Sequence, residues 1–158
     1  MISSWLRKRT GIMPLADSNI WLALALSKHQ FHSAARDWLR QQSPRDPVLF
    51  CRSTQQSFLR LLTTKAVLSP YGIPALSNKA AWSAYQDFLA DERVAWVEEP
   101  LRLESSWKML AASSTASPKL WMDAYLAAFA LSGGYQLVTT DRAFKQFKGL
   151  DLLILSKL

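Results

Sequence analysis

Five short apolar runs, each about four residues long, alternate along the chain with longer stretches of helical periodicity. Strands that are covered on both faces have this mostly apolar composition. Alternating strands and helices are typical of a mostly parallel sheet between two layers of helices. We therefore predict a three-layer α/β/α sandwich with a central sheet of about five strands. The expected strands are 13–16, 48–51, 94–97, 136–139 and 152–155.

Six helical stretches accompany these strands, and only residues 63–77 read as a long loop. The last helix has the clearest boundary signals. Ser117 is its expected N-cap, Pro118 is its first residue, and Gly133 and Gly134 lie beyond its end. The expected helices are 18–26, 33–42, 54–62, 78–90, 101–112 and 118–131.

The domain organisation is expected to be simple. Residues 13–158 contain no repeat or low-complexity tract and are interpreted as a single domain. Residues 1–12 form a basic N-terminal extension, a composition typical of a disordered tail. No window reaches the roughly 18 uncharged apolar residues that a membrane-spanning helix needs, so no membrane partner is expected.

The net charge indicates which class of binding partner to expect, and the cysteine count indicates the cellular compartment. Nineteen Lys and Arg against twelve Asp and Glu leave a formal charge of +7. This excess favours polyanions, with nucleic acid first and an acidic protein second, although many proteins are basic without such a partner. Cys51 is the single cysteine, which excludes internal disulfides and multi-cysteine zinc sites. We expect a reducing, cytoplasmic compartment.

Three aspartates occupy positions from which they could meet at one end of the sheet. Asp17 directly follows the first predicted strand and Asp141 the fourth, and open α/β sheets bind ligands at the carboxyl ends of their strands. Asp123 lies near the start of the last helix and is expected to point along its apolar stripe. Taken singly, Asp17 and Asp141 could be helix N-caps, and Asp123 could complement the helix dipole.

Taken together, three converging carboxylates would repel one another unless a cation compensated their charge. Hard oxygen ligands suit Mg²⁺ or Mn²⁺, with waters and substrate phosphates completing the coordination. Such an ion can polarise a phosphodiester and turn a bound water into a nucleophile. We therefore predict that Asp17, Asp123 and Asp141 are catalytic metal ligands, and that Asn19 helps to orient Asp17.

Three stretches of the sequence carry a family resemblance: "LADSNIWLALAL", "FCRSTQQSFLRLLT" and "SPKLWMDAYLAAFALSGGYQLVTTDRAFKQFKGLDLLIL". In this order and spacing they resemble the PIN-domain ribonucleases, and more closely the VapC-type toxins of bacterial toxin–antitoxin pairs. The resemblance implies the same three-layer fold and a metal-dependent hydrolysis of RNA. It also implies a homodimer and a small VapB-like antitoxin whose tail fills the active-site groove.

The resemblance also assigns individual positions. The three aspartates match three of the family's four acidic sites, and Thr139 and Thr140 fall where relatives place a hydroxyl near the metal. Ser57 stands where many relatives have a glutamate, so the usual fourth acid is missing. Three carboxylates can hold one metal ion, whereas a second ion would have fewer ligands.

Basic side chains near the predicted site are candidates for contact with the RNA backbone. Arg52 and Arg60 could instead form salt bridges with an acidic antitoxin tail. The RNA-binding candidates are Arg52, Arg60, Arg142 and Lys145.

Seven tryptophans are more than one core of this size usually needs. Most are expected in the core, and the others at a surface that faces a partner subunit.

Three function classes follow from these observations. The first is a Mg²⁺- or Mn²⁺-dependent endoribonuclease that is the toxin of a type II toxin–antitoxin pair. The second is a PIN-like module that has lost the fourth acid and only binds RNA or antitoxin. The third is a phosphatase or phosphoacceptor domain, which would need a second acid near Asp17, whereas Ser18 and Asn19 follow it.

Overall fold

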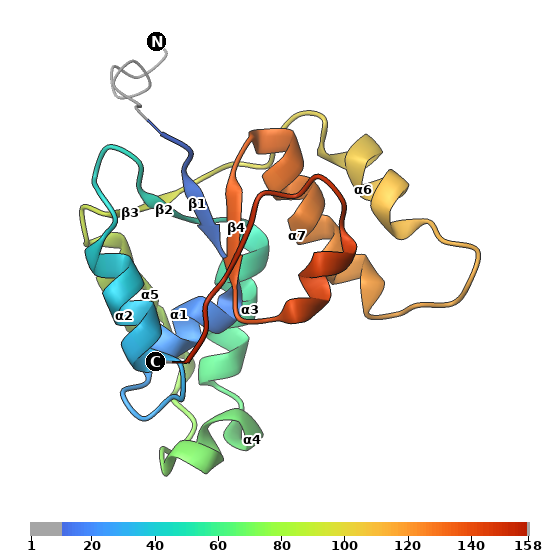
Figure 1. Cartoon of the computed structure of the whole chain (residues 1–158). Helices are drawn as coiled ribbons and strands as arrows, with labels where there is room; N and C mark the ends of the chain where they lie inside the picture. The colour runs from blue at the N-terminus through green and yellow to red at the C-terminus, as the bar shows by residue number, and fades with distance from the viewer. Residues whose placement is uncertain (1–10, 158) are drawn as a thin grey trace.

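A five-stranded, entirely parallel sheet forms the centre of the computed structural model, which describes residues 11–157 (Figure 1). The strand order is β3-β2-β1-β4-β5, so β1 lies in the middle. The predicted strands are confirmed to within a residue at each end. Of the predicted extension at 1–12, only Gly11 and Ile12 lie within the described residues. The strands are β1 (Pro14–Ala16), β2 (Val48–Phe50), β3 (Val94–Trp96), β4 (Gln136–Thr139) and β5 (Leu152–Ile154).

All six predicted helices are also present. Within residues 11–157, no helix is long and apolar enough to cross a bilayer. The α-helices are α1 (Ser18–Ala25), α2 (His32–Arg40), α3 (Arg52–Leu62), α4 (Lys65–Leu68), α5 (Asn78–Leu89), α6 (Leu103–Ala111) and α7 (Leu120–Gly133), and two 3₁₀ helices are η2 (Ser69–Tyr71) and η3 (Arg142–Gln146).

The prediction of a long loop at 63–77 was wrong, because this segment contains α4 and η2. Leu68 anchors it, since its side chain is fully buried in the core. These two helices are only four and three residues long, too short to produce a periodic pattern in the sequence.

The predicted boundaries of the last helix were wrong at both ends. The chain enters α7 through a tight turn in which the Leu120 N–H donates to the Ser117 carbonyl oxygen at 3.0 Å. Lys119 is therefore the N-cap, and no side chain caps the helix there. Gly133 is the last helical residue, and Gly134 takes the left-handed conformation, with a φ of 69°, that ends the helix.

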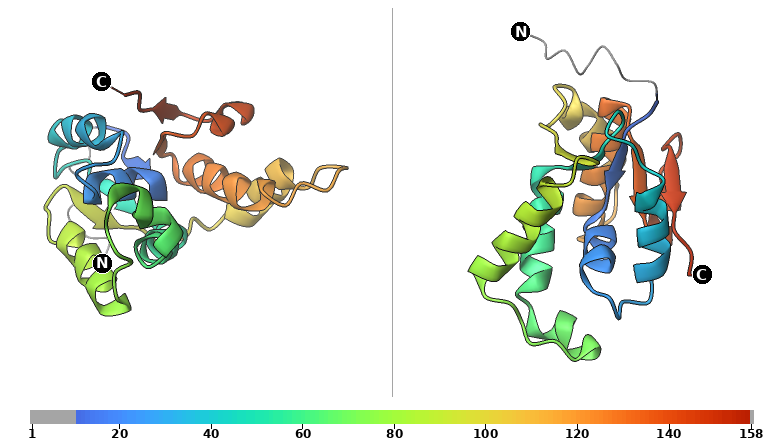
Figure 2. Two further views of the ribbon diagram at one scale, coloured as in Figure 1. Left: turned by 90° about the horizontal axis from the view of Figure 1, so that it is seen from below. Right: turned by 90° about the vertical axis from the view of Figure 1, so that its left-hand side faces the viewer.

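Helices cover both faces of the sheet, which confirms the three-layer prediction. Helices α1, α2, α3 and α5 lie on one side, and α6 and α7 on the other (Figures 1 and 2). Neighbouring strand residues alternate between two apolar clusters, as the period of two requires. Leu15 packs toward α7, whereas Ala16 packs toward α1. On the α1 side, the Trp21 ring stacks on Phe50 with 3.7 Å between centroids.

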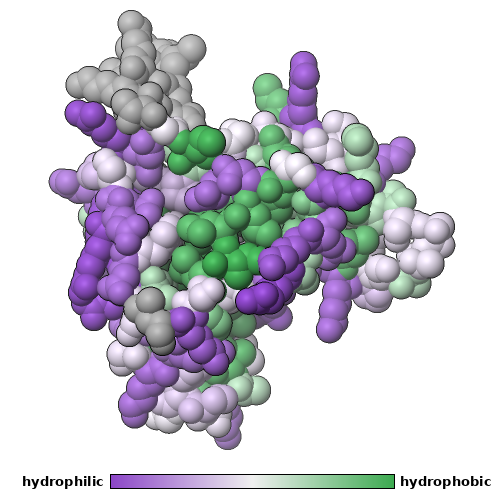
Figure 3. Space-filling view, in the orientation of Figure 1, coloured by the Kyte–Doolittle hydropathy of each residue, from purple (hydrophilic) through white to green (hydrophobic). Residues whose placement is uncertain are grey.

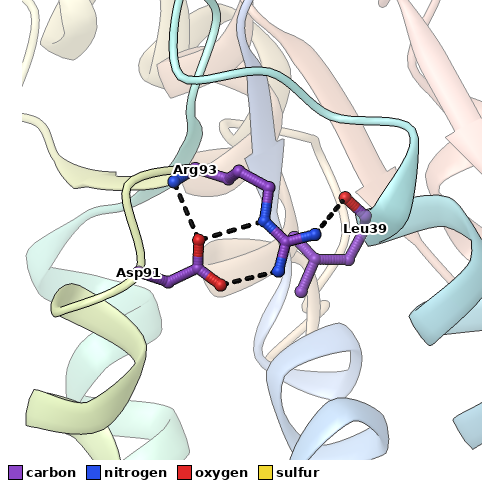
Figure 4. Close-up of polar contacts among 3 residues, drawn as sticks. All are labelled: Leu39, Asp91 and Arg93. Carbon is purple, nitrogen blue, oxygen red and sulfur yellow. Dashed lines mark hydrogen bonds and ion pairs between the residues drawn. The ribbon is translucent and has the colours of Figure 1, made fainter.

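Arg93 ties the edge strand β3 to the end of α2 (Figure 4). Its guanidinium donates to both carboxylate oxygens of Asp91, at 3.0 and 2.7 Å, and to the Leu39 carbonyl oxygen at 3.1 Å. Because Arg93 donates hydrogen bonds to the carboxylate, the pKa of Asp91 lies below its ordinary value. Two-point pairing of this kind holds a geometry better than a single contact does.

Replacing Arg93 with alanine should lower the free energy of unfolding by about 1 kcal/mol, because the mutation removes charge-assisted hydrogen bonds that are partly shielded from water. The side chains of Arg93 and Asp91 are 31% and 29% exposed, against 62% and 50% for the Arg40–Asp37 pair. Arg40→Ala is therefore the matched control and should change stability by less than about 0.5 kcal/mol. Urea denaturation measures both, and equal losses would contradict the assigned role of Arg93.

Candidate active site

Asp17 is held at the carboxyl end of the central strand by several hydrogen bonds. It is the N-cap of α1, and its Oδ1 accepts from the Ser18 N–H at 2.7 Å. Its Oδ2 accepts from the Thr139 hydroxyl at 2.8 Å and from the Asn19 amide at 3.2 Å. The carboxylate therefore has a fixed orientation, and Asn19 contacts it as expected.

Thr139 joins the ends of β1 and β4 beneath the site. Its fully buried hydroxyl donates to Asp17 and accepts from the Asn19 side-chain amide at 3.1 Å and from the Asp141 N–H at 3.0 Å. Thr140 contributes differently from the prediction, because its backbone N–H, rather than its hydroxyl, contacts Asn19 Oδ1 at 3.3 Å. Thr140 is also absent from the lining of the pocket that contains Asp17.

The three predicted aspartates, hereafter the site aspartates (Asp17, Asp123 and Asp141), line one pocket of about 510 Å³. They come from the end of β1, the first turn of α7 and the end of β4, so the fold brings together residues that are up to 124 positions apart. The other residues of this pocket are Ser18, Ser53, Thr54, Ser57, Arg60, Pro118, Lys119, Met122, Leu126 and Phe144.

Two of the site aspartates are helix N-caps and also line the pocket. Asp141 caps η3, and its Oδ1 accepts from the Ala143 N–H at 2.9 Å. Asp17 caps α1 in the same way. Each cap satisfies backbone donors at a helix start, yet both carboxylates still line the pocket.

Asp123 differs from the other two because no hydrogen bond to its carboxylate is present within residues 11–157. It is half-buried and lies beside Leu126, which agrees with the predicted position along an apolar stripe. Burial raises its pKa, and the negative charge of Asp141 raises it further, while Lys119 acts in the opposite direction.

The pKa of Asp17 is also raised, chiefly by burial. Hydrogen bonds from Thr139 and Ser18 favour its charged form and offset part of this rise, and the charge of Asp123 adds to it. The site therefore contains carboxylates that repel one another in a partly desolvated pocket. A bound cation would relieve that repulsion.

The carboxylate oxygens in this pocket suit a metal ion whose coordination is completed by water and substrate, and not an ion that protein ligands enclose completely. Among residues 11–157, no group of three or more His, Cys, Asp or Glu side chains is arranged so that it could hold a metal ion by itself. Mg²⁺ usually keeps several waters and takes one or two carboxylates together with substrate phosphates. One or two of the carboxylates in this pocket, together with waters and substrate phosphates, would suit that kind of coordination, and within residues 11–157 Asp123 accepts no hydrogen bond that would compete with an ion.

The other predicted site residues divide into two groups. Ser57, predicted to stand at the position of the family's fourth acid, and Arg60 line the same pocket as the aspartates. Arg52 lines a neighbouring pocket instead. Arg142 and Lys145 are exposed on η3, and neither lines the aspartate pocket.

Lys119 lines the pocket but was missed in the sequence, where it was taken as part of the first turn of the last helix. The signal that could have found it is its spacing, four residues before Asp123, which places the two side chains on one face of a helical turn.

Comparisons with known proteins agree with this fold. A PIN domain family model matches residues 15–150. The chain belongs to the PIN-domain family, in its VapC branch. It is 53% identical over 146 residues to Ribonuclease VapC41 of Mycobacterium tuberculosis, which covers 92% of this chain and 100% of that protein.

Two solved structures share the fold at low sequence identity. VapBC2 from Rickettsia felis, solved bound to a DNA fragment from its promoter, matches with a TM-score of 0.64 and 12% identity, covering 92% of this chain and 100% of that one. VapBC-1 from nontypeable Haemophilus influenzae matches with a TM-score of 0.64 and 17% identity, covering 90% and 98%.

Asp123→Asn should raise the melting temperature of the metal-free protein at pH 7. Because the pKa of Asp123 is raised in the folded state, the folded protein holds this proton more tightly than the unfolded chain does. Stability is therefore lost as the pH rises from the unfolded pKa through the folded pKa, and the neutral amide avoids that loss. Calorimetry at pH 7 measures the effect, with exposed Asp87 on α5 mutated to asparagine as the control.

Proposed function

We propose that this chain hydrolyses RNA phosphodiester bonds with Mg²⁺ or Mn²⁺ held by the site aspartates. Its membership of the VapC branch makes it a PIN-domain endoribonuclease toxin. The observation that carries the assignment to these residues is the convergence of three carboxylates, from three separate elements, in one pocket at the carboxyl ends of the strands.

Asp17, Asp123 and Asp141 would hold the ion, which when bound polarises the scissile phosphate and lowers the pKa of a water molecule. Thr139 and Asn19 keep Asp17 oriented, so little side-chain entropy is lost when the site is loaded.

Cationic side chains in and around the pocket suit a polyanionic substrate. Arg60 and Lys119 line the pocket beside the aspartates and are placed to attract the phosphates on either side of the cleaved bond. Arg142 and Lys145, on η3 directly after Asp141, extend the positive charge outside it. These contacts would supply affinity and register without reading the bases.

Purified, antitoxin-free protein should cut total RNA into discrete fragments when Mg²⁺ or Mn²⁺ is present. Asp17→Asn should abolish cleavage while leaving the fold intact, because asparagine preserves the size of Asp17 and still offers one acceptor oxygen but removes the charge. Gel analysis with an EDTA control measures the outcome. Wild-type cleavage by the Asp17→Asn protein, or cleavage that resists EDTA, would contradict the proposal.

A second candidate function is a binding module without catalysis, and Ser57 favours it because a hydroxyl occupies the position of the usual fourth acid in the pocket. Calorimetric titration with Mn²⁺ separates the two functions. A functional metal site should take up the ion in the wild type and lose it in the Asp123→Asn protein. RNA binding without any uptake of Mn²⁺ would support the module.

Binding of Mn²⁺ should also raise the free energy of unfolding of the protein. At an Mn²⁺ concentration about 100 times its Kd, the wild type should gain about 2.7 kcal/mol in its free energy of unfolding. The Asp123→Asn protein should gain much less under the same conditions. An equal gain in both proteins would place the ion somewhere other than the site aspartates.

The proposed partners are a VapB-like antitoxin, whose tail would enter the groove, and a second copy of the chain. The VapBC structures that share this fold support an antitoxin partner. On the face drawn in Figure 3, apolar side chains gather near the centre, where β5 runs in Figure 1. The side chains of Leu152, Leu153 and Ile154 are only half-buried there, and such patches often mark a protein interface.

A further inference from the structure

A second pocket of about 600 Å³ adjoins the aspartate pocket and has a different character. Ser53, Ser57, Arg60 and Met122 line both pockets, so the two share a wall. The far side of the second pocket is aromatic. Its remaining residues are Arg52, Gln56, Trp107, Trp121 and Tyr125.

The aromatic cluster of Trp107, Trp121 and Tyr125 is held in a defined arrangement. The Trp107 ring meets Tyr125 edge to face at 5.5 Å between centroids, and it meets Trp121 at 6.2 Å. The Trp107 N–H donates to the Trp121 carbonyl oxygen at 2.9 Å. The Tyr125 hydroxyl donates to Glu99 at 2.8 Å, so polar contacts hold both Trp107 and Tyr125 in place.

Part of this aromatic surface faces solvent beside a charged site. Trp121 is 54% exposed, and Met122, which lies between the two pockets, is 62% exposed. Large apolar side chains that stay exposed next to a catalytic pocket usually serve binding. Neither side chain belongs to the apolar core cluster on this side of the sheet.

The second pocket is also electropositive. Arg52 and Arg60 line it, whereas no aspartate or glutamate does. Within residues 11–157, neither arginine forms a salt bridge. Arg52 instead lies over the Trp96 ring at 4.3 Å and donates to Gln55 at 2.6 Å. Flat aromatic faces beside the Arg60 guanidinium match a nucleotide, which presents a base and a phosphate together.

We propose that the aromatic cluster is a stacking subsite for an unpaired base of the RNA, next to the phosphodiester that is cut. This inference rests on the proposed function and adds to it a residue contact that helps to position the substrate. Only a single-stranded or looped segment can turn a base out to meet an aromatic side chain, because a duplex keeps its bases stacked on one another.

The test uses the Asp17→Asn protein, so that binding is measured without cleavage. A fluorescent single-stranded oligoribonucleotide of mixed sequence, about ten nucleotides long, is the probe. Trp121→Ala in this background should raise the Kd roughly 5- to 100-fold, the range expected for the loss of one stacked base. Trp121→Phe should keep most of the affinity. Met109→Ala, an 86% exposed apolar side chain on α6, is the control and should change nothing.

Abasic probes provide a second, independent reading. One base is removed from the probe at a time. At one position, the missing base should weaken RNA binding by the Asp17→Asn protein but should not weaken binding by the protein that also carries Trp121→Ala, because both changes remove the same contact. The proposal would be overturned if Trp121→Ala bound RNA unchanged, or if the Asp17→Asn protein bound no RNA. It would also be overturned if removal of each base raised the Kd by the same factor with and without Trp121→Ala. A variant that binds RNA normally but no longer binds an acidic antitoxin tail would overturn it too, because the subsite would then serve a protein.

The outcomes also separate this proposal from the proposed function. If the wild type cleaves nothing with either metal, while binding in the Asp17→Asn background still depends on Trp121, the nuclease proposal fails and the subsite stands. If the wild type cleaves RNA and Trp121→Ala leaves both binding and kcat/KM unchanged, the subsite fails and the nuclease stands.

Discussion

The hydrogen bond from the Thr139 hydroxyl to Asp17 is the contact on which the geometry of the site depends. It joins the ends of β1 and β4, which are neighbours only because the sheet places them side by side. The same hydroxyl accepts from the Asp141 N–H and so sets where the third carboxylate begins. One buried threonine therefore fixes the relative positions of two site aspartates, and α7 supplies the third.

The sheet could be predicted well because its signal is local. Each strand is a short apolar run, and the two-sided burial that it implies is visible in a few neighbouring residues such as Leu15 and Ala16. The helix predictions failed where the sequence has no long periodic pattern of apolar residues. Helix α4 is held by the burial of Leu68, and the start of α7 by a backbone contact to Ser117, and neither feature leaves a pattern in the sequence.

The site was predictable in part for the same reason. Asp17 and Asp141 directly follow strands, so the topology alone puts them at one edge of the sheet. Their N-cap roles do not compete with their position in the pocket, since a cap engages only some of the carboxylate lone pairs. The aromatic pocket was beyond such reasoning, because it depends on how Trp107 of α6 packs against Trp121 and Tyr125 of α7. Of the six tryptophans within residues 11–157, only Trp21 and Trp38 are buried, so the prediction that most tryptophans lie in the core was wrong. Trp82 and Trp121 are exposed.

The central claim is that Asp17, Asp123 and Asp141 form one metal-binding nuclease site. The most direct measurement is anomalous X-ray diffraction from crystals of the protein soaked in Mn²⁺. The account predicts a strong anomalous peak in direct contact with the carboxylates of Asp17 and Asp123, and no such peak in crystals of the Asp123→Asn protein. A peak elsewhere on the molecule, with the aspartate pocket empty at saturating Mn²⁺, would contradict it.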